Sequence, residues 1–159
     1  MKLIFLDVDG VLNNTQNIKK YRLFFRGKRR LLVDSKPFYC FKKLLKEIEK
    51  NNMDVKIVIS SSWRVGSIPA DWKKLFKHYF DNPEIVKGRT PYLYKDRGIE
   101  ILDLLEIAKE KGDMIDDYIV LDDDIEDIIN HINPNKVLKI NRRYGLTNAD
   151  IEQILKKLE

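Results

Sequence analysis

Cysteine and long apolar runs are the scarcest features of this sequence. Cys40 is the only cysteine among 159 residues, which excludes a disulfide framework and any zinc site built on cysteines, and is typical of a reducing compartment. No apolar run approaches the roughly 18 residues that a membrane span requires. The N-terminal run ends at Asp7, too short and too soon acidic for a signal peptide. These absences predict a cytoplasmic protein without membrane contact.

Neither sign of charge dominates the composition. The chain has 30 lysine and arginine residues against 25 aspartates and glutamates, a net charge of +5. Hydrophobic residues make up 43% and charged residues 35%, as in ordinary globular proteins. This length fits one domain and suffices for a hydrophobic core without a structural metal. We therefore expect a single domain over residues 1–159, whose function must be inferred from its motifs.

Short apolar runs alternate with segments whose apolar residues recur at helical spacing. Strands are expected at residues 2–6, 55–59, 118–121 and 137–140, with a minor one at 84–86. Helices are expected near 35–50, after Pro69, at 97–111 and from Thr147 to 158. In the helix at 97–111, the residues expected to face inward are Ile99, Leu102, Leu105 and either Ile107 or Ala108. The alternation predicts an α/β fold, a three-layer Rossmann-like parallel sheet with helices on both faces.

One segment is strongly basic. Residues 13–33 contain seven basic residues, including Arg29 and Arg30, and no acidic one. Two apolar runs flank Gly27, so we predict a basic β-hairpin, inserted as a flap over residues 13–34. Basic residues interleaved with aromatic ones suit the phosphates and bases of a nucleic acid. The alternative is a solvated polar edge, which hairpins need to avoid association.

Carboxylates and a hydroxyl follow the expected strands where these strands end. These residues are Asp7, Asp9, Ser60, Asp122 and Asp123. In parallel α/β sheets, reactive groups collect at the carboxyl ends of the strands, so these side chains should share one edge. Carboxylates that close repel one another unless they share a cation or a proton. An all-oxygen set suits Mg²⁺, and a carboxylate can attack phosphorus, so the pattern indicates metal-assisted phosphoryl transfer.

Four motifs, in this order, resemble those of the haloacid dehalogenase (HAD) superfamily of phosphohydrolases. Residues 7–12, Asp-Val-Asp-Gly-Val-Leu, resemble the first motif, and Val58-Ile59-Ser60 resembles the second. Arg97, which opens a helix, resembles the basic third motif. Residues 121–124, Leu-Asp-Asp-Asp, resemble the acidic fourth motif together with Asp127. The resemblance spans residues 1 to about 130.

Further segments resemble, more narrowly, the small HAD domains found in RNA-repair proteins. They are Ser61-Ser62-Trp63-Arg64, Arg97-Gly98-x-Glu100-Ile101, the three aspartates at 122–124 and Gly145-Leu146-Thr147. The stretches between the motifs hold no separate domain, so the site is expected to lack a cap and to be open to a bulky substrate.

The resemblance implies a role for each matching residue. Asp7 would attack phosphorus, and Asp9 would protonate the leaving oxygen and then activate water. Mg²⁺ would be held by Asp7, the backbone carbonyl of Asp9 and Asp123, with Asp122 supporting. Two carboxylates two residues apart are needed because one attacks while the other moves protons.

Other residues are candidates for binding the phosphorylated substrate. The resemblance implies that Ser60 and Arg97 hold the phosphoryl oxygens, and Lys95 is a rival for the basic role. The remaining candidate contacts are Ser61, Trp63, Arg64 and the hairpin residues Arg29 and Arg30. Trp63 and Arg64 could equally be a packed aromatic and a solvated charge.

The resemblance predicts a Mg²⁺-dependent phosphomonoesterase that acts through an aspartyl-phosphate. Its open site and basic hairpin favour a nucleic-acid end as substrate. A nucleotide or small-metabolite phosphatase is the alternative within the enzyme class. The alternative that is not an enzyme is a non-catalytic module that binds phosphorylated ends. Every expected catalytic position carries the expected residue, which argues against such a module.

Overall fold

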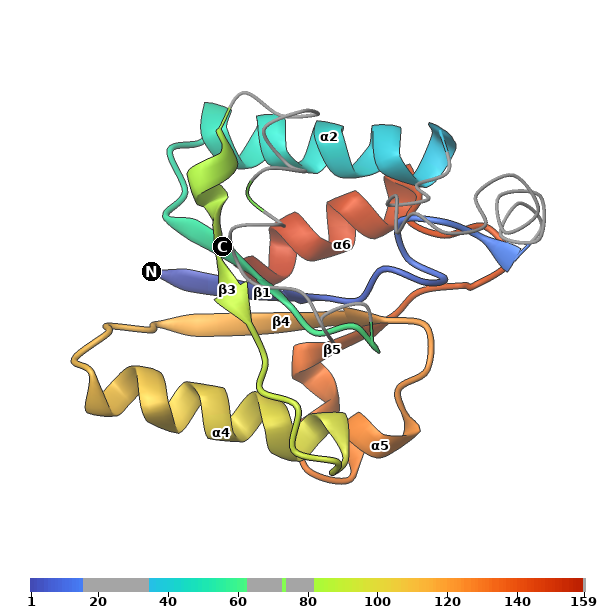
Figure 1. The fold of residues 1–159 in the computed structure, drawn as a ribbon. Helices are drawn as coiled ribbons and strands as arrows, with labels where there is room; N and C mark the ends of the chain where they lie inside the picture. Colours follow the sequence, from blue (N-terminus) through green and yellow to red (C-terminus); the bar gives the residue numbers. More distant parts are fainter. Residues whose placement is uncertain (16–34, 63–72, 74–81, 159) are drawn as a thin grey trace.

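The computed structural model describes residues 1–15, 35–62, 73 and 82–158 (Figure 1). Most of the expected basic hairpin, with Arg29 and Arg30, lies outside these residues. Trp63 and Arg64 lie outside them too, as does nearly all of the helix expected after Pro69.

Five parallel strands form the sheet, in the order β3-β2-β1-β4-β5. The strands are β1 (Lys2–Leu6), β2 (Val55–Ile59), β3 (Val86–Arg89), β4 (Asp117–Asp122) and β5 (Val137–Lys139). The central strand β1 pairs with β2 and β4, so Leu6 stands level with Ile59 and Leu121. The predicted Rossmann-like α/β fold is therefore confirmed. This register brings the carboxyl ends of three neighbouring strands together.

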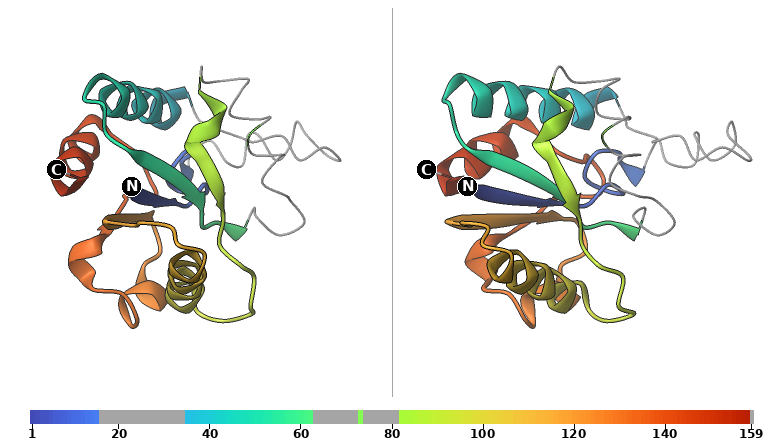
Figure 2. Two further views of the ribbon diagram at one scale, coloured as in Figure 1. Left: turned by 90° about the vertical axis from the view of Figure 1, so that its left-hand side faces the viewer. Right: turned by 60° about the vertical axis from the view of Figure 1, so that its left-hand side comes forward.

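Helices cover both faces of the sheet (Figures 1 and 2). They are α2 (Ser35–Lys50), α4 (Arg97–Glu110), α5 (Glu126–Ile129) and α6 (Asn148–Leu158), with short 3-10 turns η2 (Pro83–Ile85) and η3 (Pro134–Lys136). Alternate residues of β1 face opposite layers. Ile4 and Leu6 pack in the cluster shared with α2 and α6, whereas Leu3 and Phe5 pack in the cluster shared with α4 and α5. Two cores thus hold the central strand in place.

Two expectations for the elements were wrong. The minor strand expected at 84–86 begins only at Val86, because the preceding residues form η2. In α4, Leu102, which was expected to face inward, is 42% exposed, whereas Ile101 is buried in the core. Of the two alternatives Ile107 and Ala108, Ala108 is the buried one. Apolar residues occur on several sides of this helix, so their spacing does not define a single inward face.

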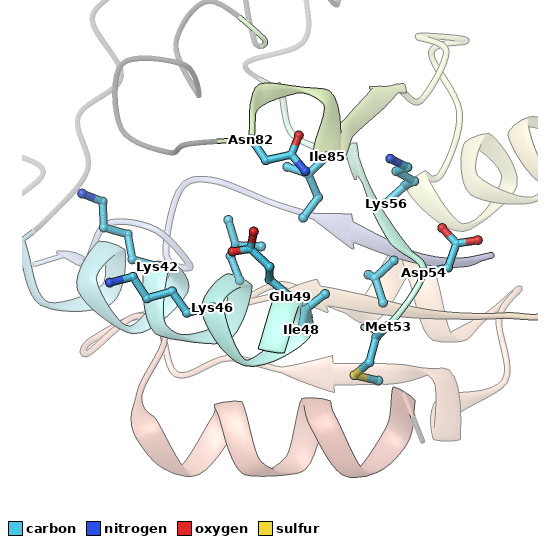
Figure 3. A pocket seen from close by; sticks show the side chains of 11 residues that line it. Lys42, Lys46, Ile48, Glu49, Met53, Asp54, Lys56, Asn82 and Ile85 are labelled. Atoms are coloured by element: carbon cyan, nitrogen blue, oxygen red, sulfur yellow. The ribbon is translucent and has the colours of Figure 1, made fainter. Parts of the chain in front are cut away.

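No helix in the described part of the chain is long and apolar enough to cross a membrane. A hollow of about 410 Å³ lies between α2 and η2, at the amino end of β2 (Figure 3). Lys42 and Lys46 border it on α2, and Ile85 borders it on η2. It lies at the edge of the sheet opposite to the strand ends that carry the acidic residues.

Candidate active site

The backbone of the sheet positions the acidic residues. The amide of Asp7 donates to the carbonyl of Leu121 at 3.0 Å, which extends the pairing of β1 with β4 beyond the last strand residue. Asp122 ends β4, and Asp123 follows it. Asp7, Asp122 and Asp123 each offer a carboxylate oxygen, and these oxygens all lie within 4.8 Å of one another. This cluster was predicted from the position of its residues at the carboxyl ends of neighbouring strands.

Burial makes the cluster electrostatically unusual. The side chain of Asp122 is fully buried, and Asp7 is only 5% exposed. Burial raises the pKa of Asp7 to about 7, against a hydrogen bond from Ser61 and the charge of Arg97, which lower it. Burial and the neighbouring Asp7 carboxylate raise the pKa of Asp122 to about 8, more than Arg97 lowers it. The cluster therefore favours a bound proton or cation over free carboxylates.

The turn after β1 fixes the orientation of Asp9. The amides of Val11 and Leu12 both donate to the carbonyl of Val8, which folds the chain back on itself. The buried Asn13 side chain accepts from the amide of Gly10 and donates to a carboxylate oxygen of Asp9, both at 2.8 Å. Asn13 thus holds the side chain of Asp9 through this hydrogen bond, a role that nothing in the sequence indicated.

Gly10 allows the two acidic motifs to approach each other. Its φ is +83°, a conformation that residues with a side chain rarely adopt. A Cβ atom at this position would lie 2.6 and 2.7 Å from the carboxylate oxygens of Asp123. Only glycine therefore permits the first motif to pack directly against Asp123.

Arg97 connects α4 to the acidic fourth motif. Its guanidinium donates to Asp122 at 2.5 Å and to the carbonyl of Asp124 at 2.5 Å. Its backbone amide donates to Asp127 at 3.1 Å, and its Nε lies 3.4 Å from the same carboxylate oxygen. The ion pairs with Asp122 and Asp127 raise the pKa of Arg97 against its burial. Arg97 therefore stays charged and positions the motif around it.

A hollow of about 350 Å³ opens above the acidic cluster. Its lining includes Asp7, Asp9, Asp123, Ser62, Tyr92, Lys95, Arg97 and Arg142. Lys95 is exposed at this rim, whereas Arg97 is mostly covered. Nε of Arg142 lies 3.2 Å from a carboxylate oxygen of Asp123. Both candidates for the basic role, Lys95 and Arg97, thus face the same space.

The serines after β2 differ in their surroundings. The Ser60 amide donates to the carbonyl of Leu6 at 2.9 Å, so Ser60 lies beside the first motif. Its hydroxyl is buried and has no hydrogen-bond partner among the described residues. Ser61, a candidate substrate contact, is buried and hydrogen-bonds Asp7 instead. The exposed neighbour, Ser62, lines the hollow.

Sequence reasoning missed three further residues at this site: Asn13, Tyr92 and Arg142. Arg142 follows β5, so it could have been predicted by also considering the residues after the carboxyl end of the last strand. Asn13 and Tyr92 lie in loops, and only the folded backbone brings them to the acidic cluster.

The donor set fits a hard divalent cation. Three carboxylates within reach of one another, without histidine or cysteine, are ligands that Mg²⁺ accepts. Burial raises the pKa of Asp7 and of Asp122 more than the charge of Arg97 lowers them, so a bound cation would offset the cost of burying their ionised forms. The group is therefore a candidate metal site of the HAD type.

The comparisons with known proteins agree with this geometry. Residues 3–151 match the family model described as "HAD domain in Swiss Army Knife RNA repair proteins". Comparison with curated proteins and with solved structures gives no match. The family match covers nearly the whole chain, including the acidic cluster. The chain belongs to the family of HAD domains in Swiss Army Knife RNA repair proteins.

Proposed function

We propose that this protein is a Mg²⁺-dependent phosphomonoester hydrolase that removes phosphate from nucleic-acid ends. The observation that carries the proposal is the buried cluster of Asp7, Asp122 and Asp123 below an open hollow whose rim holds Lys95 and Arg142. A phosphate dianion needs both features, a centre that attacks and cations that offset its charge.

Asp7 is the nucleophile in this proposal. A carboxylate oxygen of Asp7 bonds to phosphorus while the bond from phosphorus to the leaving oxygen breaks, and Asp9 gives its proton to that oxygen. Asp9 then takes a proton from water, whose oxygen attacks phosphorus and releases Asp7. Asn13 holds Asp9 in place for both transfers through its 2.8 Å hydrogen bond. Asp7, Asp123 and the carbonyl of Asp9, with Asp122 supporting, would hold Mg²⁺, which would supply positive charge that favours the ionised form of Asp7.

The basic side chains that line the hollow have different roles in this proposal. The donors of Arg97 already serve Asp122, Asp124 and Asp127, so its first role is to position the acidic motif. Lys95, exposed at the rim, is better placed to contact the phosphoryl oxygens. The Ser60 hydroxyl is buried and does not line the hollow, so the contact with phosphoryl oxygens that the resemblance implies would require this hydroxyl to become accessible.

Three observations favour a nucleic-acid end as the substrate. The family is described by its occurrence in RNA repair proteins. The hollow above the aspartates is open, and its rim carries the basic residues Lys95 and Arg142. The sequence adds seven basic residues and no acidic one between residues 13 and 33. A polymer substrate would make KM rise steeply with salt, whereas a small phosphate ester would show little change.

The test is phosphate release with Mg²⁺ from para-nitrophenyl phosphate and from 3′- and 5′-phosphorylated oligonucleotides. Asp7→Asn should abolish release from all of them, because an amide cannot form the aspartyl-phosphate. Asp54→Asn, which changes an exposed carboxylate far from the hollow, is the matched control and should remain active. Turnover by Asp7→Asn would refute the nucleophile. Tight binding of phosphorylated ends without release by the wild type would establish the non-catalytic module instead.

A further inference from the structure

Two exposed aromatic rings stand beside the candidate active site. Tyr92 and Tyr94 lie in the loop between β3 and α4, and their ring centroids are 4.4 Å apart with planes tilted by 51°. Tyr92 is 45% exposed and Tyr94 is 85% exposed. Tyr92 also lines the hollow that holds Asp7 and Asp123. Both rings therefore present surface that a ligand can contact.

The loop that carries the rings is held in a defined shape. Glu100 of α4 is buried, and its carboxylate accepts a hydrogen bond of 2.7 Å from the amide of Leu93, between the two tyrosines. Tyr94 has a φ of +56°, a left-handed conformation that is unusual for an aromatic residue. Such backbone geometry occurs preferentially at ligand sites. The tyrosines are therefore presented on an anchored loop.

Tyr92 lies where two hollows meet. On one side is the hollow above the aspartates, and on the other is a hollow of about 620 Å³ between β3 and α4. Arg89 and Lys111 line the second hollow, and Lys95 lines the first. A substrate whose phosphate reaches Asp7 and whose remainder extends toward β3 must pass the ring of Tyr92. Its path would lead from the carboxylates of the first hollow past Lys95 to Arg89 and Lys111 in the second.

We propose that Tyr92 and Tyr94 form a stacking platform for the nucleobase of the nucleotide that carries the scissile phosphate. The proposal rests on the phosphatase function proposed above and deepens it by naming what the site recognises besides phosphate. Every nucleobase has a π-face, so such a platform accepts an RNA end without reading its sequence. Stacking on aromatic side chains contributes about 5- to 100-fold in affinity per base.

The test uses 3′- and 5′-phosphorylated oligoribonucleotides whose phosphorylated nucleotide carries 2-aminopurine, a base whose fluorescence falls on stacking. Binding is followed by fluorescence, and phosphate release is measured against matched oligonucleotides that are abasic at that nucleotide. The variants are Tyr92→Leu/Tyr94→Leu, the rescue variant Tyr92→Phe/Tyr94→Phe, and Tyr39→Leu, which removes an exposed ring on α2.

We expect wild type, the Phe variant and Tyr39→Leu to quench 2-aminopurine, and the Leu variant to lose the quenching. The ratio of KM for the abasic and the base-bearing substrate should be about 10 in the wild type and close to 1 in the Leu variant. Quenching retained by the Leu variant, or a ratio near 1 in the wild type that still releases phosphate, would overturn the platform while the phosphatase stands. Quenching that depends on the tyrosines without any phosphate release would refute the phosphatase and support the platform.

Discussion

The contact between Gly10 and Asp123 yields the sharpest prediction from this structure. In Gly10→Ala, the new Cβ would lie 2.6 Å from a carboxylate oxygen of Asp123, whereas ordinary contact begins at 3.4 Å. The nearest atom, Cγ of Asp123, would lie only 2.4 Å away, so the carboxylate must move by about 1 Å away from Gly10, which changes its position relative to Asp7 and Asp122. A misplacement of about 1 Å costs roughly 100-fold in rate, so we expect kcat/KM to fall about 100-fold.

The chain provides a matched control for backbone strain. Gly112, after the end of α4, has a φ of +81°, close to the +83° of Gly10, but a Cβ there would meet no atom within 4 Å. Both alanine variants should lose about 1–2 kcal/mol of stability from the left-handed conformation. In a domain of this size that lowers Tm by about 2–8 °C. Only Gly10→Ala should also lose Mg²⁺-dependent activity.

The assay compares phosphate release across Mg²⁺ concentrations and thermal unfolding of the two variants. Gly10→Ala should need more Mg²⁺ for half-maximal activity, because its three carboxylates no longer converge. If Gly10→Ala matches Gly112→Ala in both activity and Mg²⁺ requirement, Asp123 is not a component of a metal site, and the proposed geometry is wrong.

Three further perturbations test other parts of the site. Asn13→Asp keeps the acceptor for Gly10 but repels Asp9, so kcat should fall about 10- to 100-fold while KM changes little; an unchanged kcat would exclude a positioning role. Arg97→Met leaves the buried Asp122 without its cation, so urea unfolding at pH 8 in EDTA should show that the free energy of unfolding falls by about 3 kcal/mol. A fall below about 1 kcal/mol would contradict the role of Arg97 in holding the acidic motif. In EDTA, the folded protein keeps protons on Asp7 and Asp122 up to about pH 7 and 8, whereas the unfolded chain releases them near the ordinary value of 3.8. Stability should therefore fall as pH rises from about 4 to 8, and Asp122→Asn should flatten the Tm profile between these limits; an unchanged slope in that variant would refute the assignment.

The inner strands could be predicted from the sequence because each is a buried apolar run that ends at a polar residue. Expected and observed bounds of β1 and β2 coincide. The edge strand β3 was harder, since three of its four residues are Lys87, Gly88 and Arg89, which carry no apolar pattern. Its pairing with β2 also shifts register between Ile57 and Val58. Pairing across the sheet, rather than local sequence, decides where this strand begins.

The residues of the site also divide into those that the sequence could predict and those that it could not. Asp7, Ser60, Asp122 and Asp123 follow directly from the strands, so their gathering at one edge could be predicted. The contacts around them could not be predicted: Asn13 holds Asp9, Asp127 holds the amide of Arg97, and Glu100 holds the amide of Leu93, and each contact depends on loop geometry. Glu100 shows the limit most clearly: a carboxylate within an apolar helix pattern suggests a solvated position, yet it is buried against the amide of Leu93.

The charge of the site is the common reason for the lower stability expected without metal and for the chemistry proposed with one. Asp7, Asp122 and Asp123 bring three negative charges, and the covered guanidinium of Arg97 offsets one of them. Arg142 is mostly exposed, so water screens its charge. Two negative charges therefore remain in a cluster that is poorly hydrated. Without a metal, the protein can neutralise them only by taking up protons, in agreement with the raised pKa values of Asp7 and Asp122. A divalent cation would supply the same two charges while leaving Asp7 ionised, and an ionised Asp7 is what attack on phosphorus requires.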